Sequence, residues 1–254
     1  MKKIIVCLLL MISFSGCTST TKTNKDEMKI PYDLDLSKED GADSVERDGN
    51  HEDSPYFTNQ DYYQMESTDT LTILSKFKTM QQTSEWSCGV TSSLMVLEYY
   101  GMLGEHNEET LAMYRSNELA AEATSLADII KIFEGVGGFT MHSTYDYSEE
   151  EKYEEITLEM IQSYLKKDIP VMVAWNDWGG HWQVIIGYDT MGTETTQDDV
   201  IIMADPYDTT DHNQDGYVVY PAERFYYNWT MYDFFEDNYD IAERDLLFFV
   251  AEKN

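Results

Sequence analysis

The stretch QTSEWSCGVTSSLMVLEYYG, residues 82–101, governs how the rest of this chain is interpreted. Behind its polar start, apolar residues such as Val90 and Leu94 recur at helical spacing, and Gly101 ends the run as a helix-terminating glycine does. Cys88 is therefore predicted to begin a buried helix. A thiol in that position meets the positive end of the helix dipole, which favours the thiolate over the thiol.

A reactive thiolate needs a base and a group that orients the base, and two later segments supply candidates. His181 opens the apolar run HWQVIIGYD, and Asp205 stands between the apolar run VIIMA and Pro206. Gln82 lies at the far end of the polar loop before Cys88, from which its amide can fold back to the sulfur. Taken singly, each residue has an ordinary structural explanation, because cysteine is often buried in cores and Asp before Pro is a common turn former.

In this order, the three segments resemble the C39-like branch of the papain-like cysteine peptidases. That family shows a Gln, then Cys-Gly opening a helix, then a strand that begins with His and runs into Gly-Tyr-Asp, then Asp-Pro after another strand. The resemblance covers roughly residues 71–250. It implies an α+β, papain-like fold, in which an N-terminal helical part carrying the Cys helix packs on an antiparallel β-sheet carrying His and Asp.

The resemblance also implies a role for each matching residue. Cys88 would be the nucleophile, His181 the base and Asp205 its orienter, while Gln82 would donate a hydrogen bond to the oxyanion. The predicted activity is that of a cysteine peptidase-like hydrolase acting on a peptide or protein. Two alternatives stay open: acyl transfer by the same residues, and a non-catalytic binding domain on the same fold. Should Asp205 point away, the alternative orienters are Asp177, Asp189 and Asn228.

The periodicity of the remaining chain agrees with this fold class, because helices come first and a sheet follows. Helical spacing predicts helices over residues 108–115, 125–133, 156–167 and 222–229. Extended patterns predict strands over residues 71–78, 139–145, 171–175, 181–188, 200–204, 217–220 and 246–251.

The first 17 residues, MKKIIVCLLLMISFSGC, resemble a bacterial lipoprotein signal peptide. Two lysines precede an apolar core over residues 4–14 that is too short to span a bilayer, and small residues precede Cys17. The expectation is that Cys17 is lipidated and anchors the protein outside the cytoplasm of a bacterial cell. An ordinary secretory signal and an uncleaved anchor are the alternatives. Cleavage would remove Cys7 and leave Cys88 as the one free thiol.

Residues 18–65 are predicted to form an acidic flexible tether, and residues 66–254 the peptidase domain. The tether is rich in polar residues and buries too little apolar surface to offset its ordering entropy. The formal net charge of −31 argues against nucleic acid and against electrostatic attraction to anionic lipids, so contact with the membrane is expected through the lipid only. The protein is expected to be a monomer.

Aromatic residues and glycines gather around the candidate site, and they predict a substrate cleft. The proposed substrate-binding residues are Trp86, Trp178, Gly179, Gly180 and Trp182. The glycines would let a substrate backbone approach closely. Core packing with a tight turn explains the same residues equally well, because aromatic side chains dominate both cores and binding surfaces.

The segment DHNQDGY, residues 211–217, matches the first half of a calcium-binding loop. Asp211, Asn213, Asp215 and Tyr217 are the candidate ligands. The glutamate expected at the twelfth position is replaced by Ala222, so an Asx-rich hairpin turn is the alternative. No cofactor is required for the predicted chemistry.

Overall fold

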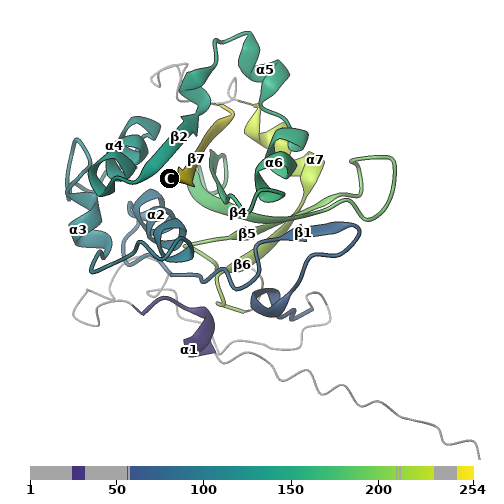
Figure 1. Ribbon diagram of the computed structural model, residues 1–254, viewed down its shortest axis with the longest axis horizontal. Coiled ribbons are helices and arrows are strands. Elements are labelled where there is room, and N and C mark those ends of the chain that lie inside the picture. Colours follow the sequence, from purple (N-terminus) through teal and green to yellow (C-terminus); the bar gives the residue numbers. More distant parts are fainter. Residues whose placement is uncertain (1–24, 32–55, 57, 210, 212, 232–244) are drawn as a thin grey trace, which may run out of the picture.

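The computed structural model describes residues 25–31, 56, 58–209, 211, 213–231 and 245–254. Its centre is an antiparallel sheet in the strand order β2-β7-β3-β4-β5-β6, with β1 pairing to β4 (Figure 1). The strands are β1 (Leu71–Ile73), β2 (Phe139–Ser143), β3 (Val171–Trp175), β4 (His181–Asp189), β5 (Val200–Ala204), β6 (Tyr217–Pro221) and β7 (Leu247–Lys253).

Strand β4 is the middle of this arrangement, because it pairs with β1, β3 and β5. Every one of its residues from His181 to Tyr188 is buried. Successive side chains of a strand point to opposite faces, so continuous burial means that both faces of β4 are covered. Helices α2 (Cys88–Tyr99) and α6 (Leu158–Leu165) both pack against it.

The helices form two groups about the sheet (Figure 1). Helix α2 lies with α3 (Glu108–Ala112) and α4 (Leu126–Val136), while α6 lies with α7 (Ala222–Trp229). The shorter helices are α1 (Lys25–Met28), α5 (Glu151–Glu155) and the 3-10 turns η2 (Tyr62–Gln64) and η3 (Thr144–Asp146). The helical part that carries Cys88 therefore packs on an antiparallel sheet that carries His181 and Asp205, as predicted from the sequence.

The predicted Cys helix is confirmed at both ends. Helix α2 begins at Cys88, and all its residues from Cys88 to Leu97 are buried, which explains why it is apolar on more than one face. Gly101 adopts a φ of +65°, and its N–H donates to the carbonyl of Glu98. Glycine reaches this left-handed conformation without steric cost, so it ends the helix.

Most other predicted elements are present with shifted ends. Ser125 and Thr157 cap α4 and α6 by accepting hydrogen bonds from the N–H groups of Asp128 and Met160. The strand predicted over residues 71–78 is shorter, since β1 ends at Ile73 and Lys76 turns into the left-handed region with a φ of +62°. Helix α5 was not predicted from the sequence.

Two pieces of the predicted tether pack against the domain. Met28 and Ile30 are buried, and the backbone of residues 28–30 exchanges hydrogen bonds with Thr79 at 2.8 and 3.0 Å. Tyr63 in η2 is also buried. Burial of these apolar side chains stabilises the contact of both pieces with the domain, although the composition of the surrounding sequence is polar. The tether prediction is therefore corrected for residues 25–31 and 58–65.

Residues 1–17, with the proposed lipidation site Cys17, lie outside the described residues, as do residues 32–55. The boundary at residue 17 therefore stays a prediction. Among the helices of the described residues, none is long and apolar enough to cross a membrane.

Candidate active site

The three predicted triad residues converge at one edge of the interface between α2 and the sheet. Cys88 is the first residue of α2, His181 is the first residue of β4, and Asp205 directly follows β5. Strands β4 and β5 are paired in antiparallel register, with Val184 opposite Ala204, so the start of β4 lies beside the end of β5. Pairing in the sheet therefore brings the imidazole to the carboxylate.

The helix is held on the same strand by a hydrogen bond from the Ser92 hydroxyl to the carbonyl of Trp182, at 3.1 Å. Because Ser92 lies one turn after Cys88, and Trp182 lies next to His181, this contact sets the sulfur against the imidazole. Nε2 of His181 lies 2.6 Å from Oδ1 of Asp205. The imidazole also interacts with the Cys88 thiol, whose pKa it lowers through a hydrogen bond and through its charge.

The surroundings of Cys88 favour its thiolate. Burial alone would raise the pKa of the thiol, but the hydrogen bond and charge of His181 act in the opposite direction. The backbone of Trp182 and that of Gly89 also lower the pKa of the thiol. The net result is a thiol pKa below its ordinary value, even though the residue is only 6% exposed.

His181 shows the complementary shift. Burial disfavours the charged ring, but the charge and hydrogen bond of Asp205, together with the Cys88 contact, raise the pKa of His181 to about 10. A lowered thiol pKa beside a raised imidazole pKa favours a thiolate–imidazolium pair over the neutral thiol and imidazole.

Asp205 is itself fixed from several sides. Its Oδ1 accepts the backbone N–H of Tyr207 at 2.7 Å, and its own N–H donates to the carbonyl of Gly216 at 2.8 Å. The Tyr207 ring stands edge-on to the His181 ring, with 6.4 Å between ring centroids. The sequence analysis did not identify Tyr207, although its position two residues after Asp205 in the Asp-Pro-Tyr turn was a usable signal.

Gln82 lies in the same region, because its backbone N–H donates to the carbonyl of Pro206 at 2.8 Å. Its side chain is 1% exposed, and Nε2 donates to the carbonyl of Ser84 at 2.8 Å. An amide nitrogen carries two N–H groups, so this bond orients the amide and leaves a second donor. Gln82 is thus beside the Asp205 turn, at the end of the loop that leads into Cys88.

The predicted substrate-binding residues lie in three different environments, and the first is an exposed turn. Trp178 is 67% exposed and has a φ of +52°, and Gly179 and Gly180 follow it with φ values of +87° and +126°. They form the turn that leads into His181, with open space at both glycines. The Trp178 ring also approaches Tyr207, at 6.3 Å between centroids. These three residues lie next to His181, and their role in substrate binding stays a prediction.

Trp182 packs in the core, so its prediction as a residue of the substrate cleft is wrong. It is 4% exposed, and its Nε1–H donates to the carbonyl of Thr124 at 2.8 Å. The ring packs on Gly89, where a Cβ would lie 3.0 Å from Cδ1 of the indole. As part of β4, whose residues are covered on both faces, Trp182 has no solvent-facing side available.

Trp86 is half-buried beside Arg115, whose guanidinium lies over its ring at 4.6 Å from the centroid.

The three residues named as alternative orienters of His181 form hydrogen bonds with other groups. Asp177 accepts the Tyr220 hydroxyl at 3.0 Å, Asp189 accepts the Met191 N–H, and Asn228 donates to the carbonyl of Arg224.

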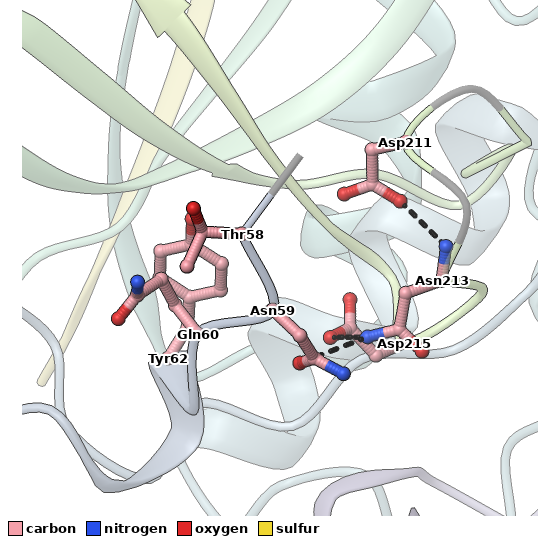
Figure 2. A pocket seen from close by; sticks show the side chains of 7 residues that line it. All are labelled: Thr58, Asn59, Gln60, Tyr62, Asp211, Asn213 and Asp215. Carbon is pink, nitrogen blue, oxygen red and sulfur yellow. Dashed lines mark hydrogen bonds between the residues drawn. The ribbon is translucent and has the colours of Figure 1, made fainter. Parts of the chain in front are cut away.

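The candidate calcium loop lines a small polar pocket with residues of the N-terminal segment (Figure 2). Asp211 accepts the Asn213 backbone N–H, and the Asn213 amide donates to Asp215 at 2.5 Å. Asp215 also accepts the N–H of Tyr217, whose hydroxyl donates to the carbonyl of Phe77. Within the described part of the chain, no group of three or more His, Cys, Asp or Glu is arranged to hold a metal ion. Calcium binding at this loop therefore stays a prediction.

The model of the peptidase C39-like family matches residues 74–235, which contain Gln82, Cys88, His181 and Asp205. This chain belongs to the peptidase C39-like family. The curated proteins gave no match.

Among solved structures, the C39-like chain is similar to the crystal structure of UfSP from C. elegans. The sequence identity is 12% and the TM-score 0.40, over 71% of this chain and 33% of that one. The chain thus spans about a third of the length of that structure. Membership of the C39-like family identifies the chain as a cysteine peptidase-like hydrolase.

Proposed function

We propose that this C39-like protein hydrolyses a peptide or isopeptide amide through a thioester on Cys88. The observation that carries the proposal is the hydrogen-bonded row from the Cys88 thiol through the His181 ring to Asp205. A non-catalytic binding domain would have no need for a thiolate–imidazolium pair, which is costly to keep buried.

In the proposed reaction, the Cys88 thiolate attacks the carbonyl carbon and forms a tetrahedral intermediate with a negatively charged oxygen. The Gln82 amide and the backbone N–H of Cys88 would donate hydrogen bonds to that oxygen. The His181 imidazolium then gives its proton to the leaving amine as the C–N bond breaks. Water, deprotonated by the neutral imidazole, cleaves the thioester and restores the thiolate pair. Asp205 holds the ring in position throughout.

We further propose that the reaction takes place outside the cytoplasm, on a monomeric protein held at the membrane by lipid on Cys17. The support is the signal-like composition of residues 1–17. Replacement of Cys17 by Ser is expected to move the protein from the membrane fraction to the soluble fraction. Equal membrane retention of both forms would contradict the lipid anchor.

The nucleophile is tested by comparing the wild type with Cys88→Ala in labelling by a thiol-directed activity-based probe. We expect labelling of the wild type only, with pretreatment by iodoacetamide abolishing it. Labelling of Cys88→Ala at the wild-type rate would refute the assignment. Trp178→Ala serves as a second variant, since it removes an exposed ring beside His181 while leaving the thiolate pair in place.

A further inference from the structure

Glu108 is a buried glutamate close to the loop that carries Gln82. It is the first residue of α3 and is 3% exposed, whereas its neighbour Glu109 is exposed. Glutamate is almost never fully buried without partners. Glu108 has several partners, and they belong to two different segments of the candidate active site.

The first segment is the loop over residues 82–87. Oε1 of Glu108 accepts the backbone N–H of Thr83 at 3.0 Å, and Oε2 accepts the Thr83 hydroxyl at 2.5 Å. Thr83 directly follows Gln82, whose own N–H donates to the carbonyl of Pro206 at 2.8 Å. The backbone around Gln82 is therefore held at two points, one beside Asp205 and the other at Glu108.

The second segment is the start of the Cys helix. The same Oε1 of Glu108 accepts the hydroxyl of Thr91 at 2.6 Å. Ser87 is the N-cap of α2, and Thr91 lies in its first turn. One carboxylate thus joins the Gln82 loop to the helix that begins with Cys88.

The attachment of Glu108 is itself rigid. Asn107 caps α3 by accepting the N–H of Thr110 at 2.9 Å, and the Thr110 hydroxyl accepts the N–H of Asn107 at 2.9 Å. A reciprocal cap directly before Glu108 limits the movement of its backbone. The carboxylate is consequently presented from a fixed point to both segments.

We propose that Glu108 is a positioning residue that holds the Gln82 loop against the Cys88 helix, so that the oxyanion donors stand correctly about the sulfur. The inference rests on the proposed function. Donors that stabilise an oxyanion act through preorganised geometry, and their benefit is lost when they move. Glu108 touches neither the sulfur nor the imidazole, and its effect is confined to steps that form an oxyanion.

Two small reagents separate the oxyanion step from the thiolate. Iodoacetamide reacts with Cys88 by displacement of iodide at a saturated carbon, and no oxyanion forms. p-Nitrophenyl acetate reacts through attack on a carbonyl carbon, with an oxyanion intermediate that expels p-nitrophenolate and leaves an acetyl thioester. The two second-order rate constants are measured on the full chain, and the values for Cys88→Ala are subtracted as background.

The test compares Glu108→Gln with Glu109→Gln, which makes the same charge change at the exposed neighbouring position. We expect Glu108→Gln to lower the ratio of the ester rate to the iodoacetamide rate by about tenfold, less than loss of a whole oxyanion donor. The iodoacetamide rate itself should stay within about twofold, because the His181 pair remains. Glu109→Gln should leave both rates unchanged.

An unchanged ratio in Glu108→Gln would overturn the proposal, and so would an equal fall of both rates with a lower melting temperature, which indicates a general structural role. Should Glu108→Gln fail to fold, Thr83→Val removes only the hydroxyl contact and should lower the ratio by a smaller factor. A wild-type protein that reacts with iodoacetamide no faster than a free thiol would instead refute the proposed function.

Discussion

At the scale of single residues, the site depends on the balance between burial and hydrogen bonding. Cys88 and His181 are both nearly inaccessible to solvent, and burial opposes the charged form of each. The contact between them, with Asp205 behind the ring, outweighs that opposition. Asp205 is therefore the residue whose removal should change the charge state of the pair.

We expect Asp205→Asn to lower the His181 pKa from about 10 towards its ordinary value and to raise the thiol pKa. Alkylation by iodoacetamide reports the thiolate, so the wild-type rate should fall only as the pH drops through the lowered thiol pKa. At pH 6 the variant should react more slowly than the wild type, because a smaller fraction of its thiol is ionised. Asp189→Asn, on the other end of β4, is the control, and identical pH profiles for Asp205→Asn and wild type would contradict this.

Gly89 shows why a residue next to the nucleophile is constrained by packing. A Cβ there would lie 2.8 Å from Cβ of Thr124 and 3.0 Å from the Trp182 ring. Replacement of glycine by alanine in a helix gains up to about 1 kcal/mol, but overpacking costs about 1–3 kcal/mol. We expect Gly89→Ala to lower the free energy of unfolding by about 1 kcal/mol in urea titration. A variant as stable as the wild type would contradict this, because it would show that Thr124 and Trp182 can move aside without lowering the free energy of unfolding.

At the scale of elements, the segment between β5 and β6 connects the candidate site with the small polar pocket that the candidate calcium loop lines. Its N-terminal end carries Asp205, whose N–H donates to the carbonyl of Gly216 at the other end. Gly216 packs so closely on Thr79 that a Cβ would approach its hydroxyl oxygen to 2.6 Å. The glycine of the calcium-like motif is therefore explained by close packing and by its φ of +83°.

The calcium hypothesis is decided by a melting curve. Because the Asn213 amide nitrogen faces Asp215, where a calcium ligand would present oxygen, we expect the same melting temperature in calcium and in chelator. A bound ion would instead stabilise the folded state in proportion to its concentration over its dissociation constant. A calcium-dependent rise that Asp215→Asn abolishes would establish the site.

At the scale of the whole molecule, the N-terminal segment 25–31 joins the domain from outside its predicted boundary. It forms a parallel bridge between Lys29 and Thr79, and it buries Met28 and Ile30. Thr79 lies three residues before Gln82, so the segment borders the part of the chain that leads to the candidate site.

Truncation measures the contribution of this segment. We expect a chain beginning at residue 58 to be less stable by about 1–3 kcal/mol than a chain beginning at residue 25, since it loses two buried apolar side chains whose gain is partly offset by ordering entropy. Urea titration of both chains gives the difference. The chain beginning at residue 25 should match the full chain. Equal stability of all three would restore the tether prediction for residues 25–31.

Local patterns in the sequence were sufficient for the main elements and for the order of the site residues. Cys88 at a helix start, His181 at a strand start and Asp205 at a turn are each encoded by spacing, caps and turn formers within a few residues. Such signals are local because backbone hydrogen bonds in helices and turns join near neighbours. The family resemblance then predicted that the three residues meet, and the hydrogen bonds between them agree with it.

Only the tertiary structure decided which of the flanking residues face the site. Trp178 and Trp182 are separated by three residues in the same aromatic segment, yet one is exposed and the other is packed on Gly89. Glu108 carries no local sign of its contacts, because Thr83 and Thr91 precede it by 25 and 17 residues. The orientation of a side chain depends on what packs against it, and those neighbours come from parts of the chain that local periodicity does not relate.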